Sequence, residues 1–321
     1  MRIKIRTLTP IWTGNINRES TKLRETSIIG SLRWWFEAIV RGLGGYACDP
    51  SSENRCKLDQ KRFQRSIKEG KTVQEALDKQ VCPVCQLFGC TGWSRRFRLE
   101  INGIHNEDIE KGKGSEAGLR VNTVFNLKFI FLSDLVPEQK WLLKKTLWII
   151  ENYGAIGGRI TWKPNGKWGT SYGLIKIEDY GEFRQWDTFS DINKVKTWLK
   201  RNKELIGKEN DPNWFNFRFY WVVEGRYLTR KQINEIVKRD PENPKEYLPD
   251  ADENFDKWLG GCVGVSKKIF SFGNPQKVFG YVRDDNELNI IYQRIQKLFD
   301  KNINFKRGYE ILDDISGDKN G

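Results

Sequence analysis

The sequence predicts an α+β protein built from two units, each with the order strand, helix, strand, strand, helix, strand. Two patterns carry this prediction. Short segments alternate apolar and polar residues, which is typical of strands, and longer segments repeat apolar residues every three to four positions, which is typical of helices. Because the patterns follow one another in this order in both halves of the 321-residue chain, we expect two ferredoxin-like (RRM-like, βαββαβ) domains.

The first unit has the clearer pattern. Its expected strands cover residues 2–8, 95–101, 119–132 and 172–177, and its expected helices cover residues 28–40 and 137–152. Thr26 or Ser27 is the expected N-cap of the first helix, and Pro137 opens the second. Residues 44–92 interrupt the pattern as a cysteine-bearing insertion with a charged helix at about 59–79. Residues 102–118 are charged and glycine-rich, so we expect a loop there.

The second unit repeats the order more loosely. Its expected strands cover residues 215–223, 266–272, 277–282 and 302–306, and its expected helices cover residues 229–239, 252–259 and 284–300. We therefore place an N-terminal domain at 1–178, a polar linker with one helix near 191–206 at 179–212, and a C-terminal domain at 213–321.

The composition favours a soluble protein that binds polyanions. Lys and Arg number 55 against 42 Asp and Glu, which gives a net charge of +13, and such an excess attracts nucleic acid. The sequence has no apolar run of 18 residues, so it predicts no membrane span. Residues 1–6 alternate like a strand and lack the apolar core of a signal peptide, so we expect a cytoplasmic protein.

The segment from Tyr153 to Gly173 has the composition of an RNA-binding loop. It holds six glycines, four aromatic residues and three cations, and no acidic residue. Glycines let successive N–H groups cradle phosphate, cations neutralise phosphate, and aromatic faces stack on unpaired bases. The expected RNA-binding residues here are Gly154, Gly157, Gly158, Arg159, Trp162, Lys163, Lys167 and Trp168. The alternative is a long hairpin connection with turn glycines and surface tryptophans.

The first helix offers a second set of RNA-binding candidates. Its apolar stripe is Ile28, Leu32, Trp35 or Phe36, and Ile39. This leaves another face to Ser27, Gly30, Arg33 or Trp34, and Arg41. Amide groups of Ser27 and Gly30 at the helix start could bind an anion, Arg33 could pair with phosphate, and Trp34 could stack on a base. The alternative for Trp34 is a wider core stripe. Lys22 and Arg24, just upstream, complete the set, and we expect it to share one groove with the glycine loop.

Four cysteines have spacing typical of a structural metal site. Cys48, Cys56, Cys82 and Cys85 form the pattern C-x7-C-x25-C-x2-C, and a closed set of four ligands suits tetrahedral zinc. The alternative is four reduced, buried thiols. A redox pair is disfavoured because the C-x-x-C pair does not follow a thioredoxin-like strand. Cys90 and Cys262 show no partner signal.

Several of these residues form motifs known from one superfamily. The motifs are Thr9-Pro10, Thr13-Gly14, Arg24, Ser27, the run Gly30-Ser31-Leu32-Arg33-Trp34-Trp35, and Leu87-Phe88-Gly89. Together with the glycine loop after the second helix, they resemble the RAMP superfamily of CRISPR-associated proteins. The resemblance covers the first ~175 residues, which is the length of one ordinary domain. The Arg-Trp-Trp-Phe helix is most similar to the first-numbered RAMP subunit of the type III-B (Cmr) effector complex.

This resemblance implies a place in a multi-subunit complex that uses crRNA to destroy invading RNA. It implies contact with the crRNA 3′ region or with target RNA, other Cmr subunits as partners, and no catalysis by this chain. Here Trp162, Lys163 and Trp168 replace residues of the superfamily's commonest glycine loop, so the RNA contacts are expected to depend more on stacking.

Two alternative functions stay open. A metal-independent RNA-processing endonuclease of the same superfamily would need a general base and acid. His105, the only histidine, lies in the 102–118 loop near Glu107, and the glycine loop offers only Tyr153 and Tyr172. A protein-binding structural module would place aromatic residues at an apolar interface, whereas here they alternate with Lys and Arg.

Overall fold

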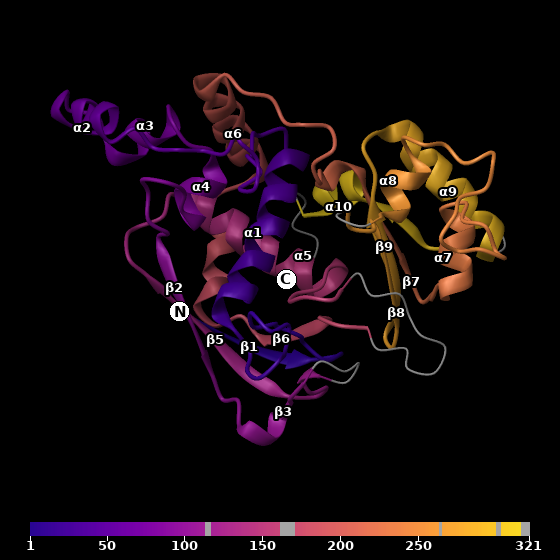
Figure 1. The fold of residues 1–321 in the computed structure, drawn as a ribbon. Coiled ribbons are helices and arrows are strands. Elements are labelled where there is room, and N and C mark those ends of the chain that lie inside the picture. Colours follow the sequence, from indigo (N-terminus) through magenta and orange to yellow (C-terminus); the bar gives the residue numbers. More distant parts are fainter. Residues whose placement is uncertain (113–116, 161–170, 263–264, 300–302, 316–321) are drawn as a thin grey trace.

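A computed structural model describes residues 1–112, 117–160, 171–262, 265–299 and 303–315 (Figure 1). Over these ranges the chain is mixed α and β with antiparallel sheets, as predicted. The first sheet contains β1 (Arg2–Thr7), β2 (Phe97–Asn102), β5 (Val124–Phe131) and β6 (Ile175–Asp179). Their order across the sheet is β2-β5-β1-β6, and each neighbouring pair is antiparallel.

One face of this sheet is covered by α1 (Glu25–Gly42) and α5 (Pro137–Tyr153), which also contact each other (Figure 1). The alternation of residues in β1 determines which face of the strand packs against the core, because Ile3 and Ile5 are buried while Arg2 and Lys4 are exposed. Ile3 pairs with Leu127 and Ile5 with Phe125 across the central strand pair. The predicted periodicities therefore position this sheet and its two helices correctly.

The second sheet has the order β10-β7-β9-β8, again with every pair antiparallel. Its strands are β7 (Tyr220–Glu224), β8 (Ile269–Gly273), β9 (Gln276–Tyr281) and β10 (Phe305–Arg307), and its helices are α7 (Arg230–Ile236), α8 (Asp256–Gly260), α9 (Asp285–Phe299) and α10 (Gly308–Asp314). The sequence did not predict α10. Tyr220 and Val222 belong to the apolar cluster shared with the first sheet, whereas Trp221 and Val223 belong to a second cluster with α7 and α9. Residues from Tyr220 to Val223 are all buried because both faces of this strand are covered.

The insertion and the predicted linker also differ from the expectation in detail. The expected charged helix at 59–79 is two helices, α2 (Gln60–Lys68) and α3 (Val73–Asp78), followed by α4 (Pro83–Phe88). Gly70 has φ +83°, and Thr72 starts the new helix with a capping box. In the predicted linker, η2 (Gly181–Thr188) and α6 (Ile192–Ile206) bury Phe183 and Leu199 in the first core.

Several boundaries were predicted wrongly, among them the strand expected at 215–223, which begins at Tyr220, and the helix expected at 252–259, which begins at Asp256. The helix expected from residue 28 begins at Glu25, and its N-cap is Arg24, without a side-chain hydrogen bond. The strand expected at 119–132 is split by a turn at Asn122, whose φ is 61°, into β4 (Gly118–Leu119) and β5. Within the 102–118 loop, the chain forms η1 (Asn106–Asp108) and β3 (Ile109–Glu110), and β3 pairs with β4. η3 (Phe217–Phe219) precedes β7.

A buried lysine at the junction of the two sheets gives a pH prediction. Lys277 on β9 is 8% exposed and donates a hydrogen bond to the carbonyl of Asn152 at 2.5 Å. Burial lowers the pKa of Lys277 to about 8. Because the unfolded chain holds this proton up to about pH 10.4, the unfolded state binds more protons between these values, and stability due to this group rises with pH.

We expect the free energy of unfolding of Lys277→Met to exceed that of the parent near neutral pH and the difference to shrink between about pH 8 and 10.4. The full change is up to about 3 kcal/mol for a pKa shift of this size. Urea unfolding at pH 7, 8.5 and 10 measures it, with the exposed Lys297→Met as the matched control. A pH-independent difference would contradict the assignment.

Candidate RNA-binding groove and cysteine cluster

A groove of about 330 Å³ lies where α1 meets the chain that follows α5. Its walls come from three segments far apart in sequence. The lining residues are Trp12, Thr13, Gly14, Ser27, Gly30, Ser31, Trp34, Trp35, Ala155, Gly157, Gly158 and Ile160. The predicted convergence of the α1 helix and the glycine loop on one groove is therefore confirmed for the described residues.

Hydrogen bonds hold the three segments together at the groove. The N–H of Gly157 donates to Ser31 Oγ at 2.9 Å, and the N–H of Gly158 donates to the carbonyl of Trp12 at 2.8 Å. The N–H groups of Gly154 and Ile156 also donate to backbone carbonyls. Since these four amides are already paired, the predicted cradle of free N–H groups is wrong for this part of the loop.

The glycines have a packing role instead. Gly157 has φ +88°, and a Cβ there would lie 2.9 Å from the carbonyl oxygen of Trp12; a Cβ on Gly158 would lie 2.7 Å from the Trp12 ring. A Cβ on Gly154 would lie 2.7 Å from the ring of Trp35. The glycines therefore allow the backbone to pack directly against two indole rings.

Trp12 is a groove residue that the sequence analysis missed. Its ring is held against the glycines, and the Arg159 guanidinium lies 4.3 Å from the ring centroid. Its buried Nε1 has no hydrogen-bond partner in the described part of the chain. The sequence feature that could have identified Trp12 is its position between Pro10 and Thr13-Gly14, within the family motif. Nothing in the local pattern predicted that Trp12 contacts a loop more than 140 residues away.

The two neighbouring tryptophans of α1 have different environments. Trp35 is fully buried and its Nε1 donates to the carbonyl of Ala155 at 2.8 Å. Trp34 is half-buried, with its ring 4.5 Å from that of Phe215, centroid to centroid, and it also lines the groove. Trp34 therefore packs on the core, as the alternative interpretation predicted, and it also borders the groove.

The start of α1 corrects the expected anion site. Because the helix begins at Glu25, Gly30 lies more than one turn inside it, and its N–H is not one of the unpaired amides of the terminus. Gly30 is nevertheless exposed on the groove, and a Cβ at this position would meet no atom within 4 Å. The lack of a side chain keeps this part of the groove open.

The cationic candidates occupy different places. The Arg33 guanidinium donates to Glu37 Oε1 at 2.8 Å, the Gly89 carbonyl at 2.9 Å and Cys85 Sγ at 3.3 Å. Arg33 is thus bound within the protein beside the cysteines, and it does not line the groove. Lys22 is exposed. Thr13 Oγ1 donates to the Lys22 carbonyl and accepts from the Arg24 N–H, so a groove residue positions both. Trp162, Lys163, Lys167 and Trp168 lie outside the described residues.

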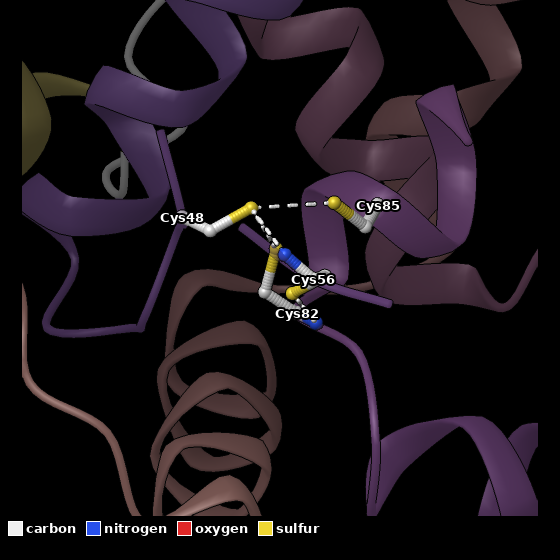
Figure 2. A group of neighbouring side chains, drawn as sticks. All are labelled: Cys48, Cys56, Cys82 and Cys85. Atoms are coloured by element: carbon white, nitrogen blue, oxygen red, sulfur yellow. Dashed lines mark hydrogen bonds between the residues drawn. The ribbon is translucent and has the colours of Figure 1, made fainter. Parts of the chain in front are cut away.

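The four predicted cysteines form one buried cluster, which Figure 2 shows. Their sulfur atoms all lie within 4.8 Å of one another. Cys48 Sγ lies 3.5 Å from Cys85 Sγ and 3.9 Å from Cys82 Sγ. Four sulfurs bound tetrahedrally at about 2.3 Å from a zinc ion would be about 3.8 Å apart. The four predicted ligands therefore lie close enough together for one zinc ion to bind them.

The surroundings of the cluster link it to α1. Arg33 contacts Cys85, and Arg41 donates to the carbonyls of Ala47 and Cys48. Glu37 lies between the two arginines on the same helix face, and burial raises the pKa of Glu37 to about 7, although Arg41 and Arg33 oppose this shift. Hydrogen bonds from the neighbouring thiols lower the pKa of Cys48, whereas burial and hydrogen bonds within the cluster raise the pKa values of Cys56, Cys82 and Cys85.

The remaining candidates lie apart from these sites. Cys90 is half-buried and Cys262 is exposed. His105 is exposed and precedes η1, where its N–H donates to Asp108 Oδ2 at 2.8 Å. His105 is not among the described residues that line the groove. No helix in the described ranges is both long and apolar enough to cross a membrane.

Comparison with known proteins places the first half of the chain in a family. The family model of the RAMP superfamily matches residues 4–162, which include α1, the cysteine cluster and the described groove. The chain carries a RAMP-superfamily domain over these residues.

Solved structures that are similar to the chain include Cmr1 from Pyrococcus furiosus in its apo form, at 12% identity and a TM-score of 0.47, with 96% of this chain and 98% of that chain covered. Others are chains from cryo-EM structures of the type III-B Cmr-beta complex bound to cognate target RNA. One has 11% identity, a TM-score of 0.43 and coverage of 92% and 98%. Another, with AMPPnP and in the presence of ssDNA, has 13% identity, a TM-score of 0.42 and coverage of 93% and 99%. No curated protein sequence matches significantly.

Proposed function

We propose that this chain is a non-catalytic, cytoplasmic RNA-binding subunit of a type III-B CRISPR (Cmr) complex, and that its groove holds nucleotides of the crRNA 3′ region or of target RNA. The observation that carries the proposal is the groove itself. Three tryptophans, two hydroxyl residues of α1 and the family's glycines surround it, and the family model covers all of them. Other Cmr subunits are the proposed protein partners.

The chemistry of the groove suits an unpaired nucleotide. Indole faces stack on any base, so Trp12 and Trp34 provide sequence-tolerant contacts. Hydroxyl groups such as that of Ser27 can bond to a ribose or a phosphate. A volume of about 330 Å³ lies at the lower end of the range of small-molecule pockets, which suits a nucleotide and is too small for a duplex.

The same lining supports a binding role without catalysis. General acid–base cleavage needs a group that exchanges a proton within reach of the reacting atoms. The described groove residues carry no carboxylate, imidazole or amine. RNA retention without cleavage is therefore the expected behaviour.

Both units fit the proposed fold of this subunit. Numbered within each unit, the strands have the order 4-1-3-2 in both sheets, with a helix after the first and the third strand. This is the arrangement of the ferredoxin-like fold, and we propose that both units are versions of it.

Filling the groove at Gly30 tests the proposed function. Gly30→Met is expected to fold at least as stably as the parent, because Gly is worse than Met in a helix by about 0.8–1 kcal/mol and a Cβ there meets no neighbour. It should weaken binding of single-stranded RNA at least tenfold, since its side chain occupies the groove. Gly30→Ala is the matched control, and it should bind RNA like the parent.

Filter binding and gel analysis of the same RNA measure affinity and cleavage together. Trp34→Ala should reduce the binding free energy by about 1–3 kcal/mol if a base stacks there. If Gly30→Met binds as tightly as Gly30→Ala, the groove is not the RNA site. If RNA is cleaved by the parent and not by His105→Ala, the nuclease alternative is correct.

We further propose that Cys48, Cys56, Cys82 and Cys85 hold one structural zinc ion. Their sulfur spacing supports it, and the site is closed because all four side chains are buried. Zinc would cross-link the insertion internally, joining the segment of Cys48 and Cys56 to the start of α4, and no step of RNA binding requires contact with the metal.

A further inference from the structure

Most of the net positive charge of the chain comes from two segments that do not line the groove. Residues 55–71 have a net charge of +5, and residues 192–208 also have a net charge of +5, out of +13 for the whole chain. These segments contain α2 and α6. By contrast, the described residues that line the groove carry no charged side chain. Much of the net positive charge is therefore concentrated in two segments outside the described lining of the groove.

The two basic segments lie beside each other in the fold. α3 contacts both α2 and α6, and the three helices lie on the same side of the molecule (Figure 1). Asn202 on α6 donates a hydrogen bond to the Asp78 carbonyl at the end of α3, at 3.0 Å. Lys208 after α6 donates to the Asn54 carbonyl before α2, at 3.3 Å. We call the exposed cations of these two segments, which α3 connects, the α2–α6 basic surface.

Folding does not explain the composition of this surface. No residue of α2 is buried, and its half-buried Phe63 packs at the edge of the first core, with its ring 5.9 Å from that of Trp93, centroid to centroid. Lys61, Arg65 and Lys68 follow one another at four- and three-residue spacing, which places them on one side of α2. On α6, Val195 and Leu199 face the core, while Lys196 and Lys200 are exposed.

Few of these cations are neutralised within the protein. Lys71, Lys194 and Lys203 pair with Glu69, Asp191 and Glu209. The other Lys and Arg residues of the two segments have no carboxylate within 4 Å in the described part of the chain, and most of them are exposed. An array of unpaired, flexible cations is suited to binding a polyanion, and it repels itself when nothing is bound.

We propose that the α2–α6 basic surface binds the sugar–phosphate backbone of an RNA strand, independently of its bases. The proposal rests on the proposed RNA-binding function and assigns its two parts to different regions. The groove contacts a nucleotide, and the α2–α6 basic surface provides the electrostatic part of the affinity. The surface fits RNA better than a protein because protein interfaces have an apolar centre depleted of charge, whereas α2 and α6 present mainly lysine and arginine outward.

The test replaces four exposed residues in the full-length protein: Lys61→Gln, Arg65→Gln, Lys196→Gln and Lys200→Gln. The control quadruple variant, Lys231→Gln, Lys245→Gln, Lys257→Gln and Lys297→Gln, removes the same charge from exposed sites of the second unit. Two probes are used, a single-stranded RNA and an abasic ribose–phosphate strand of equal length. Affinities are measured over a series of salt concentrations.

We expect the surface variant to bind both probes at least tenfold more weakly at low salt. Its slope of log affinity against log salt should become shallower by about 0.7 for each phosphate that the variant no longer neutralises. The control variant should resemble the parent. Gly30→Met should lose affinity for RNA and keep its affinity for the abasic strand, so the groove and the surface are tested separately.

Unchanged binding of the abasic strand by the surface variant would overturn the proposal and point to an acidic protein as the partner of this surface. Equal losses in the surface and control variants would also overturn it, because the effect would then come from total charge. Failure of the parent to bind either probe at low salt would reject both the surface and the proposed function. If only Gly30→Met behaves unexpectedly, the groove assignment fails and the surface assignment stands.

Discussion

Removing the proposed zinc ion is expected to destabilise this protein strongly. Purified without chelator, the full chain should contain about one equivalent of zinc. Cys82→Ser should lose the metal and lower the free energy of unfolding by more than about 3 kcal/mol, since apparent binding energies of structural zinc reach ~10–16 kcal/mol in small zinc-finger peptides. Elemental analysis and urea unfolding measure the two effects.

The position of the cysteines explains why the effect should spread. Cys82 is the N-cap of α4, and its N–H lies 3.4 Å from Cys56 Sγ. Arg33 joins Cys85 and Gly89 to α1. Loss of metal would leave buried thiols crowded together and loosen the packing of the insertion on α1. Cys262→Ser, at an exposed site, is the control. Protein that contains no zinc, or equal zinc content in the two variants, would reject the site.

Trp35→Ala is expected to have the second-largest effect, a loss of about 3–5 kcal/mol of unfolding free energy. The Trp35 ring is fully buried and contacts the rings of Phe217, Tyr220 and Phe279, so it connects α1 with the second sheet. Truncation would leave a cavity between the two units and would also remove the hydrogen bond to Ala155.

Trp34→Ala provides the comparison, because the neighbouring tryptophan is only half-buried. Trp34→Ala should lower the free energy of unfolding less than Trp35→Ala does. For each kcal/mol of stability lost, it should weaken RNA binding more. Thermal unfolding and RNA titration of both variants measure this contrast. Equal losses of stability would show that Trp34 belongs to the core as fully as Trp35 does.

The sequence alone predicted those features that depend on local periodicity or on spacing. Alternation gave β1 its buried face, and the three-to-four-residue repeat located α1, α5 and α9 within a few residues. The four cysteines could be grouped because ligand spacing is a property of the chain itself, and the structure brings their sulfurs together. The family motifs predicted the RAMP superfamily, which the family model confirms.

Helix ends and turns were less predictable from the sequence. The start of α1 at Glu25 lacks a side-chain cap, so no capping signal marked it. In the sequence, Gly70 could be read as a glycine tolerated inside one charged helix. The capping box at Thr72 was the pattern that could have located the break between α2 and α3.

Only the tertiary structure decided which side chains meet. Trp12 lines the groove, Arg33 donates a hydrogen bond to Cys85, and the loop amides form hydrogen bonds within the protein. Most of these contacts join residues far apart in the sequence, and such contacts depend on how complete elements pack rather than on the residues beside them. For the same reason the net charge of +13 indicated polyanion binding from the sequence, whereas its concentration on α2 and α6, away from the groove, became evident only when packing placed the insertion against α6.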